Sequence, residues 1–313
     1  MQENTNQTMK KITKVLLFIM SLTTVVTIES CQTAKSVTAS KMLKFNLEKG
    51  KGYDYEMIIN MDQEIMGQKM QMDMSNYYSM DVVEDDGNTK TITSKIDRFK
   101  IKMNGGGMNL EVDTDKPLPE SGEMTDNKKN PLKMLNHLFG AIRGQRFTMK
   151  VDAEGKILNV EGFENMAKLL ADSLDLNEKD RQDMMKQFDG QFNAKSTKDQ
   201  FERFFYIFPN KEVKVGDSWQ KNTAASGPMG GKYTSTYKVT EIEGEMVTLE
   251  ETTKVESDNE KMNMKGDIKG VLVVDSKSGL VVTADQDMKL ASDAGGMKFE
   301  IIGKTKIKGK ARN

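Results

Sequence analysis

The chain has 313 residues, and its 46 basic and 47 acidic side chains give a formal net charge of −1 at pH 7. Without a net positive field, binding to nucleic acid through bulk charge is excluded, and no nucleic-acid partner is expected. Hydrophobic residues make up 37% and charged residues 30% of the chain. This ordinary balance predicts a folded domain with a real core.

Residues 1–30 are predicted to be a signal peptide. Three lysines, Lys10, Lys11 and Lys14, precede an apolar run, VLLFIMSLTTVVTI, that extends from Val15 to Ile28. The run is shorter than the roughly 20 residues of a membrane-spanning helix and has the length of a signal-peptide core. The pattern therefore predicts export.

Cys31, the only cysteine, follows directly in the segment TIESC. A lone cysteine has no internal disulfide partner. TIESC resembles the lipobox of bacterial lipoproteins, with Ile28 three residues before the cysteine and the small Ser30 directly before it. Glu29 departs from the pattern, which favours a small or apolar residue there. The resemblance implies that Cys31 is lipidated and anchors the protein to a membrane. The alternative is an ordinary cleaved signal that leaves a free thiol.

Residues 31–42 are polar and small after the cysteine and are expected to form a flexible tether. By resemblance to lipoproteins of the Bacteroidota, an acidic run after the cysteine would mark export to the outer surface, and none is present. We therefore expect a cell-envelope protein that is anchored in the outer membrane and faces the periplasm.

From residue 43 to residue 160 the sequence predicts a β-meander. Between Tyr53 and Met61 the apolar residues occupy every second position, and the same period continues from Met70 to Val82 after a turn near Gly67. Asp86-Gly87 is a strong hairpin signal. The apolar phase then slips, which predicts a β-bulge near Asp97.

Residues 163–208 are predicted to be helical, because apolar stripes recur at helical spacing. Ser196 or Thr197 would cap the last helix, and Pro209 would end it. A second meander is predicted over 211–308, with strands at 231–242, 245–256, 260–275, 280–290 and 296–308.

The predicted fold is an α+β domain over 43–313 that is mostly β, a curved antiparallel meander sheet with a central block of amphipathic helices packed on one face. Two packed half-sheets are the alternative. A faint echo links the two meanders, since Gly50-x-x-Tyr53 matches Gly216-x-x-Trp219 at their starts.

The chain contains 25 methionines, many of them at alternate strand positions. A copper(I) site needs two or three soft sulfurs converging on one ion, whereas alternate residues on a strand lie about 7 Å apart. No histidine or cysteine accompanies them, so no metal or cofactor is predicted. Methionine side chains also repack around apolar ligands of variable shape. Either a dry core or a hydrophobic ligand is therefore expected against Met57, Met61, Met70, Met72, Met74, Met80 and Trp219.

Enzyme chemistry finds little support in the sequence. His137 is the only histidine, and no zinc-protease, phosphate-loop or dinucleotide motif is present.

Trp219, in the segment GDSW, is predicted to plug the end of the core, with a ligand-stacking role as the alternative. Lys304, Lys306, Lys308 and Lys310 alternate along the last strand and would protect a sheet edge or contact acidic lipid headgroups.

TIESC, FPNKEVKVGDSW and VDSKSGLV together resemble a family of uncharacterised Bacteroidota envelope lipoproteins, over nearly the whole mature chain. More loosely, the layout of strands, helices and strands is similar to half-barrel lipoprotein carriers, which hold acyl chains between sheet and helices. The resemblances imply a membrane-anchored protein without catalytic activity that binds a hydrophobic or lipid ligand. A structural or protein-partner-binding module with a dry core is the alternative, and a hydrolase of unknown substrate is the third. No protein partner can be named.

Overall fold

The computed structural model describes residues 40–65, 67–105, 108–116, 140, 142–162, 178–179, 182, 193–226, 230–257, 263–292 and 299–312. The chain divides into two units, Met1–Val37 and Thr38–Asn313, and every described residue belongs to the second. The predicted signal peptide, Cys31 and His137 lie outside the described residues. None of the helices in the described part of the chain is long and apolar enough to cross a membrane.

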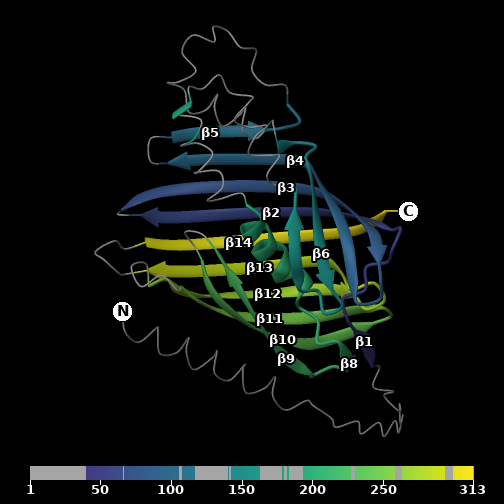
Figure 1. Ribbon diagram of the computed structural model, residues 1–313. Helices are drawn as coiled ribbons and strands as arrows, with labels where there is room; N and C mark the ends of the chain where they lie inside the picture. The colour runs from purple at the N-terminus through teal and green to yellow at the C-terminus, as the bar shows by residue number, and fades with distance from the viewer. Residues whose placement is uncertain are drawn as a thin grey trace, which may run out of the picture. The chain divides into compact units, whose positions relative to one another are not determined.

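Twelve antiparallel strands form one large sheet, in the order β7-β6-β4-β3-β2-β14-β13-β12-β11-β10-β9 with β5 pairing β4 off this path (Figure 1). Strands that follow one another in the chain are mostly neighbours in the sheet, and the first of them, β2, pairs with the last, β14. The strands are β2 (Gly52–Ile65), β3 (Gln68–Asp85), β4 (Thr89–Gly105), β5 (Met108–Asp113), β6 (Arg146–Asp152), β7 (Ile157–Glu161), β9 (Ser218–Ala225), β10 (Gly231–Glu243), β11 (Met246–Glu256), β12 (Lys265–Asp275), β13 (Leu280–Ser292) and β14 (Phe299–Arg312).

Two short strands, β1 (Lys41–Leu43) and β8 (Lys211–Val213), pair separately. The residues after β1 contact the ends of strands in the large sheet. Asn46 N–H donates to the carbonyl of Ser278 at 3.1 Å, and Gly50 N–H donates to that of Val82 at 2.8 Å. Leu43, Phe45 and Leu47 are buried in the core. This segment therefore closes one end of the core.

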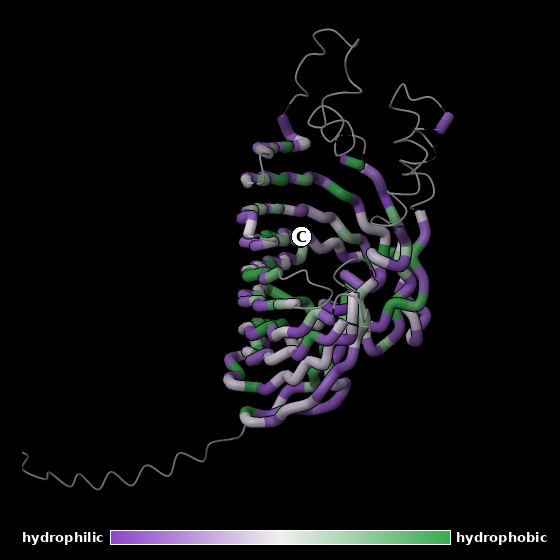
Figure 2. Tube along the Cα trace, turned by 90° about the vertical axis from the view of Figure 1, so that its left-hand side faces the viewer, coloured by the Kyte–Doolittle hydropathy of each residue, from purple (hydrophilic) through white to green (hydrophobic). Residues whose placement is uncertain are grey.

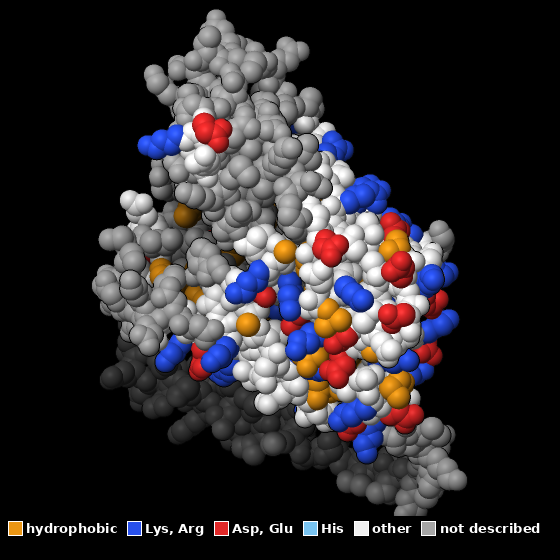
Figure 3. All heavy atoms as spheres, in the orientation of Figure 1, with side chains coloured by type: hydrophobic (Ala, Val, Ile, Leu, Met, Phe, Trp, Pro, Cys, Tyr) orange, Lys and Arg blue, Asp and Glu red, His pale blue; other side chains and the backbone are white. Residues whose placement is uncertain are grey.

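Hydrophilic and hydrophobic residues alternate along the strands (Figure 2), and buried positions alternate with exposed ones along β10 and β11. This alternation gives the sheet a polar outer face. The lysines of β14 do not lie at an edge, because β14 is flanked by β13 and β2. Lys304 pairs with Asp287 at 2.9 Å and Lys306 with Asp285 at 3.2 Å. The predicted edge protection is therefore wrong, because these lysines form ion pairs across neighbouring strands. Contact with acidic lipid headgroups stays a prediction. Figure 3 shows acidic and basic side chains interspersed on the visible face.

The predicted central block of amphipathic helices is wrong. The structure is mostly β, and α5 (Ala194–Phe205) is the one regular helix that the described residues contain. Asn193, not Ser196 or Thr197, caps it, and Ser196 completes the capping box. Most of the predicted helical segment before Asn193 lies outside the described residues. Among the residues that the structure describes, side chains from β3, β4, β6, β10 and β11 join a single hydrophobic cluster, so the sheet buries much of its own apolar face.

Several local predictions are confirmed. Arg98 pairs with Tyr77 and Ile96 with Tyr78, so Asp97 is the extra residue of a β-bulge. The turn after β3 has Gly87 at φ +87°. The echo between the meanders has a counterpart in the backbone, because Gly216 N–H donates to the carbonyl of Val239 at 2.8 Å just as Gly50 N–H donates to that of Val82.

Helix α5 spans the two ends of the strand order, β7 and β9, which do not pair with each other. Ile157 N–H on β7 donates to the Glu202 carboxylate of the helix at 3.1 Å. On the other side, the Trp219 Nε1–H of β9 donates to the carbonyl of Ile207, just beyond the helix, at 2.7 Å. Lys221 on β9 lies 3.5 Å from Glu154 in the turn before β7. The helix and these side chains thus join the two edges.

Candidate binding site on the inner face

We call the face of the sheet that contacts α5 the inner face. The strand register places four methionines on it in one row that crosses β13, β14, β2, β3 and β4. This methionine row consists of Met288, Gly303, Met61, Met72 and Met103. Met61 and Met72 were predicted as ligand-lining residues from their strand period, whereas Met103 and Met288 join them only through the register.

The methionine row is apolar but not wholly closed. Met61 is 7% exposed, and Met72, Met103 and Met288 are half-buried. Gly303 leaves room between its neighbours, because a Cβ there would lie 2.9 Å from Met288 Cε and 3.4 Å from Met61 Cγ. Met61, Met72 and Met288 belong to or pack against a second hydrophobic cluster, which also contains Tyr233, Val255, Met264, Ile268, Leu290 and Ile301. Met103 packs against the main core, and Met72 contacts both clusters.

Most of the other predicted methionines contact the main core. Met74 is half-buried opposite Ile59 and packs against that core, whereas Met70 is half-buried opposite Gln63. Met57 and Met80 are buried beneath Phe201, Phe204 and Phe205 of α5, around a cavity of about 10 Å³. That volume is at the lower limit for one water molecule. The part of the inner face beneath the helix is therefore dry core.

Trp219 lies at the edge strand β9 and is half-buried. Its indole N–H is held by the carbonyl of Ile207, and its ring lies 5.9 Å from that of Tyr237 at an interplanar angle of 31°. Both the hydrogen bond and the ring contact agree with the predicted structural role, in which the Trp219 side chain packs against the main core where the second meander begins.

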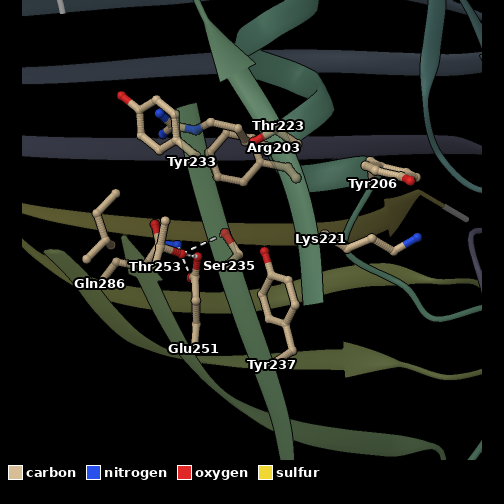
Figure 4. Close-up of a pocket in the computed structure, with 12 residues that line it drawn as sticks. Arg203, Tyr206, Lys221, Thr223, Tyr233, Ser235, Tyr237, Glu251, Thr253 and Gln286 are labelled. Carbon is tan, nitrogen blue, oxygen red and sulfur yellow. Dashed lines mark hydrogen bonds between the residues drawn. The ribbon is translucent and has the colours of Figure 1, made fainter. Parts of the chain in front are cut away.

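A polar pocket, which the sequence did not predict, adjoins the methionine row (Figure 4). Its volume is about 370 Å³ including open solvent at the mouth, of which about 20 Å³ admits the centre of a water molecule. Twelve side chains line it, from α5 and its C-cap residue Tyr206 and from β9, β10, β11, β12 and β13: Arg203, Phe204, Tyr206, Lys221, Thr223, Tyr233, Ser235, Tyr237, Glu251, Thr253, Ile268 and Gln286.

Glu251 is the buried charge of this pocket, with 5% of its surface exposed. The register aligns it with Gly270 on β12 and, beyond that, with Gln286 on β13. A Cβ on Gly270 would lie 2.7 Å from Gln286 Cγ, so the missing side chain lets Gln286 cross over β12. Gln286 Nε2–H then donates to Glu251 Oε2 at 2.5 Å.

Hydroxyl groups complete the surroundings of Glu251. Thr253 Oγ1–H donates to Glu251 Oε1 at 2.7 Å, and Ser235 Oγ lies 2.7 Å from Thr253 Oγ1. Since the one Thr253 proton is directed to the carboxylate, Ser235 is the donor in that second bond. Burial and the charge of Glu251 raise the pKa of the neighbouring Tyr237 hydroxyl, which stays protonated and a donor.

Two cations enter the pocket from its other side. The Arg203 guanidinium carbon lies 4.8 Å from the centre of the Tyr233 ring, and Lys221 Nζ lies 3.9 Å from that of Tyr206. Such cation–π contacts stabilise a cationic side chain that is partly removed from water. The pocket thus combines one hydrogen-bonded carboxylate with two cations and an apolar border.

The ionisation of Glu202 affects how tightly α5 is held. Burial raises its pKa, and the hydrogen bond from Ile157 N–H opposes that shift. When the pKa of a glutamate is higher in the folded protein than in the unfolded chain, its protonated form stabilises the fold. This contribution to the free energy of unfolding is fully present below the pKa of the unfolded chain, about 4.3, and is lost as the pH rises through the pKa of the folded protein.

Glu202→Gln, which keeps a carbonyl acceptor for Ile157, is therefore expected to raise the free energy of unfolding at about pH 7 by about 1 kcal/mol or less, with no gain at about pH 3. Urea unfolding at both pH values measures this difference. Glu250→Gln, at an exposed position of β11, is the control. Equal pH profiles for the two variants would contradict the argument.

The described residues contain no group of three or more histidine, cysteine, aspartate or glutamate side chains that could hold a metal ion. Their arrangement instead suits an amphipathic molecule, because an apolar row and a polar pocket share one face of the sheet. Neither the methionine row nor the polar pocket corresponds to a recognisable sequence motif, because strand pairing brings together residues that are distant in the sequence.

A family model described as a family of unknown function, DUF6263, matches residues 87–281, which is more than half of the sequence. The chain belongs to this family. The matched region includes the GDSW segment. That the family has no established function confirms one part of the predicted resemblance, and the lipoprotein character and the Bacteroidota origin stay predictions. No curated protein sequence matches the chain.

Several solved structures show a broad likeness to this chain, lipovitellin and an autotransporter translocator domain among them. A structure of lipovitellin that describes its lipid–protein interactions is 10% identical with a TM-score of 0.47, over 85% of this chain and 26% of the lipovitellin chain. This chain thus spans about a quarter of lipovitellin. The translocator domain of the autotransporter NalP from Neisseria meningitidis is 7% identical with a TM-score of 0.36, over 83% and 88% of the two chains. Both TM-scores are below 0.5, so neither likeness bears on function.

Proposed function

We propose that this DUF6263 protein is a binding protein without catalytic activity, which holds a hydrophobic or lipid-like ligand against the methionine row. One observation carries the proposal. Four methionines from four strands lie in one row across the inner face, with Gly303 between Met288 and Met61, and three of the four are half-buried. Flexible, polarizable side chains that are apolar but incompletely packed are typical of surfaces that adapt to varied apolar ligands.

The proposed location is the periplasmic face of the outer membrane, with the protein anchored through acyl chains on Cys31. This part rests on the lipobox resemblance of TIESC and on the polar segment that follows it. A lipid-anchored binding protein would meet its ligand at the surface of the membrane that carries the anchor.

Native mass spectrometry of the full chain, purified from its own envelope, tests both parts. We expect a covalent mass increase on Cys31 and a discrete non-covalent adduct of lipid size. Met72→Lys places a charge within the methionine row, and desolvating that charge against an apolar chain is unfavourable. The adduct should fall about tenfold or more.

Gln71→Lys is the matched control, because it adds the same charge to the same strand on the exposed outer face. It should leave the adduct unchanged. An adduct that persists in Met72→Lys would contradict the placement of the ligand, and an unmodified Cys31 would contradict the anchor.

A second candidate function is a structural or partner-binding module with a dry core. The small volumes of the two inner cavities, about 10 and about 20 Å³, favour it. A bare polypeptide mass for the wild type, with no adduct that Met72→Lys removes, would support this candidate over ligand binding.

A further inference from the structure

Arg203 is one of the two cations that line the polar pocket. It lies in α5 and is half-buried at the polar pocket, where its guanidinium contacts the face of Tyr233. No hydrogen bond or ion pair joins this guanidinium to any residue that the structure describes. Five N–H donors in a fixed fork are thus available toward the pocket, and a partly desolvated guanidinium is matched best by a carboxylate or phosphate.

The carboxylate of the same pocket is already satisfied. Both oxygens of Glu251 accept a hydrogen bond, one from Thr253 and one from Gln286, and the Ser235 hydroxyl is directed along the same chain toward it. Lys221, whose side chain is 11% exposed, adds a second cation near the mouth and is 3.5 Å from Glu154. Each Glu251 oxygen thus already has a partner, whereas the Arg203 guanidinium has none among the described residues and is the charged group best placed to meet a guest.

The polar pocket and the methionine row are continuous. Tyr233 and Ile268 line the pocket and also belong to the apolar cluster of Met61 and Met72. In the strand register Ile268 is the direct partner of Met288. A molecule with its polar end beside Arg203 would therefore lay its apolar part on the methionine row.

We infer that the ligand is an anionic amphiphile, whose carboxylate or phosphate binds Arg203 in the polar pocket while its chain contacts the methionine row. This inference rests on the proposed function and adds the charge of the ligand. It also assigns Arg203 as the residue that selects for that charge.

Displacement of the uncharged fluorophore N-phenyl-naphthylamine from the full chain tests the inference with ligands of one chain length: palmitate, hexadecyl phosphate, hexadecanol and hexadecylamine. We expect palmitate or the phosphate to bind more tightly than the alcohol. Arg203→Gln should weaken the anion about ten- to hundredfold and leave hexadecanol unchanged. Lys195→Gln, an exposed position on the same helix, is the control. Whichever anion binds more tightly identifies the headgroup.

Glu251→Gln tests the sign of the ligand's charge independently, through the direction in which affinity changes. If the pocket takes an anion, removing the nearby negative charge strengthens its binding. If the pocket takes a cation, hexadecylamine binds best and this variant weakens it, which would overturn the inference. Equal affinities for palmitate and hexadecanol in the wild type would also overturn it, while leaving the apolar site intact. Binding of none of the four would contradict the proposed function as well.

Discussion

Replacing Gly155 with alanine is expected to lower the free energy of unfolding by about 3 kcal/mol and to loosen α5 from the sheet. Gly155 lies in the turn between β6 and β7 at φ +91°. An added Cβ would lie 2.6 Å from the carbonyl carbon of Phe205 and closer still to its oxygen. Both contacts are with backbone at the end of the helix, so no side chain can move aside. Urea unfolding followed by Trp219 fluorescence measures the loss.

Gly87→Ala separates the two causes of this effect. Gly87 has nearly the same φ, +87°, and nothing lies within 4 Å of a Cβ placed there. Its replacement should cost only the backbone strain of about 1–2 kcal/mol. If both alanine variants lose the same stability, the close approach of the helix to the β6–β7 turn contributes nothing, and the account of how α5 joins the sheet edges fails.

Phe201→Ala is expected to cost about 3–5 kcal/mol, because it removes the centre of the aromatic cluster beneath α5. The Phe201 ring is 4% exposed and lies 5.3 Å from Tyr78, 5.6 Å from Phe147 and 6.0 Å from Phe205. These rings belong to the helix, β3 and β6, so one truncation removes contacts between three elements. Thermal unfolding of the variant measures the effect.

Leu158→Ala on β7 is the comparison for this variant, since Leu158 is 50% exposed. Its truncation should change the free energy of unfolding by no more than about 0.5 kcal/mol. Phe201→Leu should fall between the two alanine variants. A loss at Phe201 no larger than that at Leu158 would show that the helix is not fixed to the sheet through this ring.

The strands were predictable because their side chains alternate with a period of two, and a slip in that period located the bulge at Asp97. The helical block was predicted wrongly for a physical reason. Apolar stripes after residue 163 were assumed to cover a one-sided sheet, but residues as distant as Phe147 on β6 and Leu249 on β11 share one core. A sheet that covers itself needs less helix, and the local pattern does not show that closure.

The candidate site was only partly predictable. Period and composition identified Met61 and Met72, whereas Met288 reaches them through β14, a strand far along the chain. The polar pocket did carry one readable signal, because Glu251 and Thr253 occupy the inward phase of a strand that also includes Leu249 and Val255. Polar residues in an apolar phase indicate a buried network, but the role of Gly270 in admitting Gln286 requires the register.

The pairing of β2 with β14 also bears on how the chain reaches its folded state. Strand β2 is among the first to be made and β14 the last, and they pair in register from Gly52 to Ile65. Contacts between such distant segments carry a large loop-closure cost, and topologies rich in them fold slowly. Until β14 arrives, the edge of β2 is an unpaired template for other chains. We therefore expect the nascent protein to depend on protection from aggregation until its final strand is available.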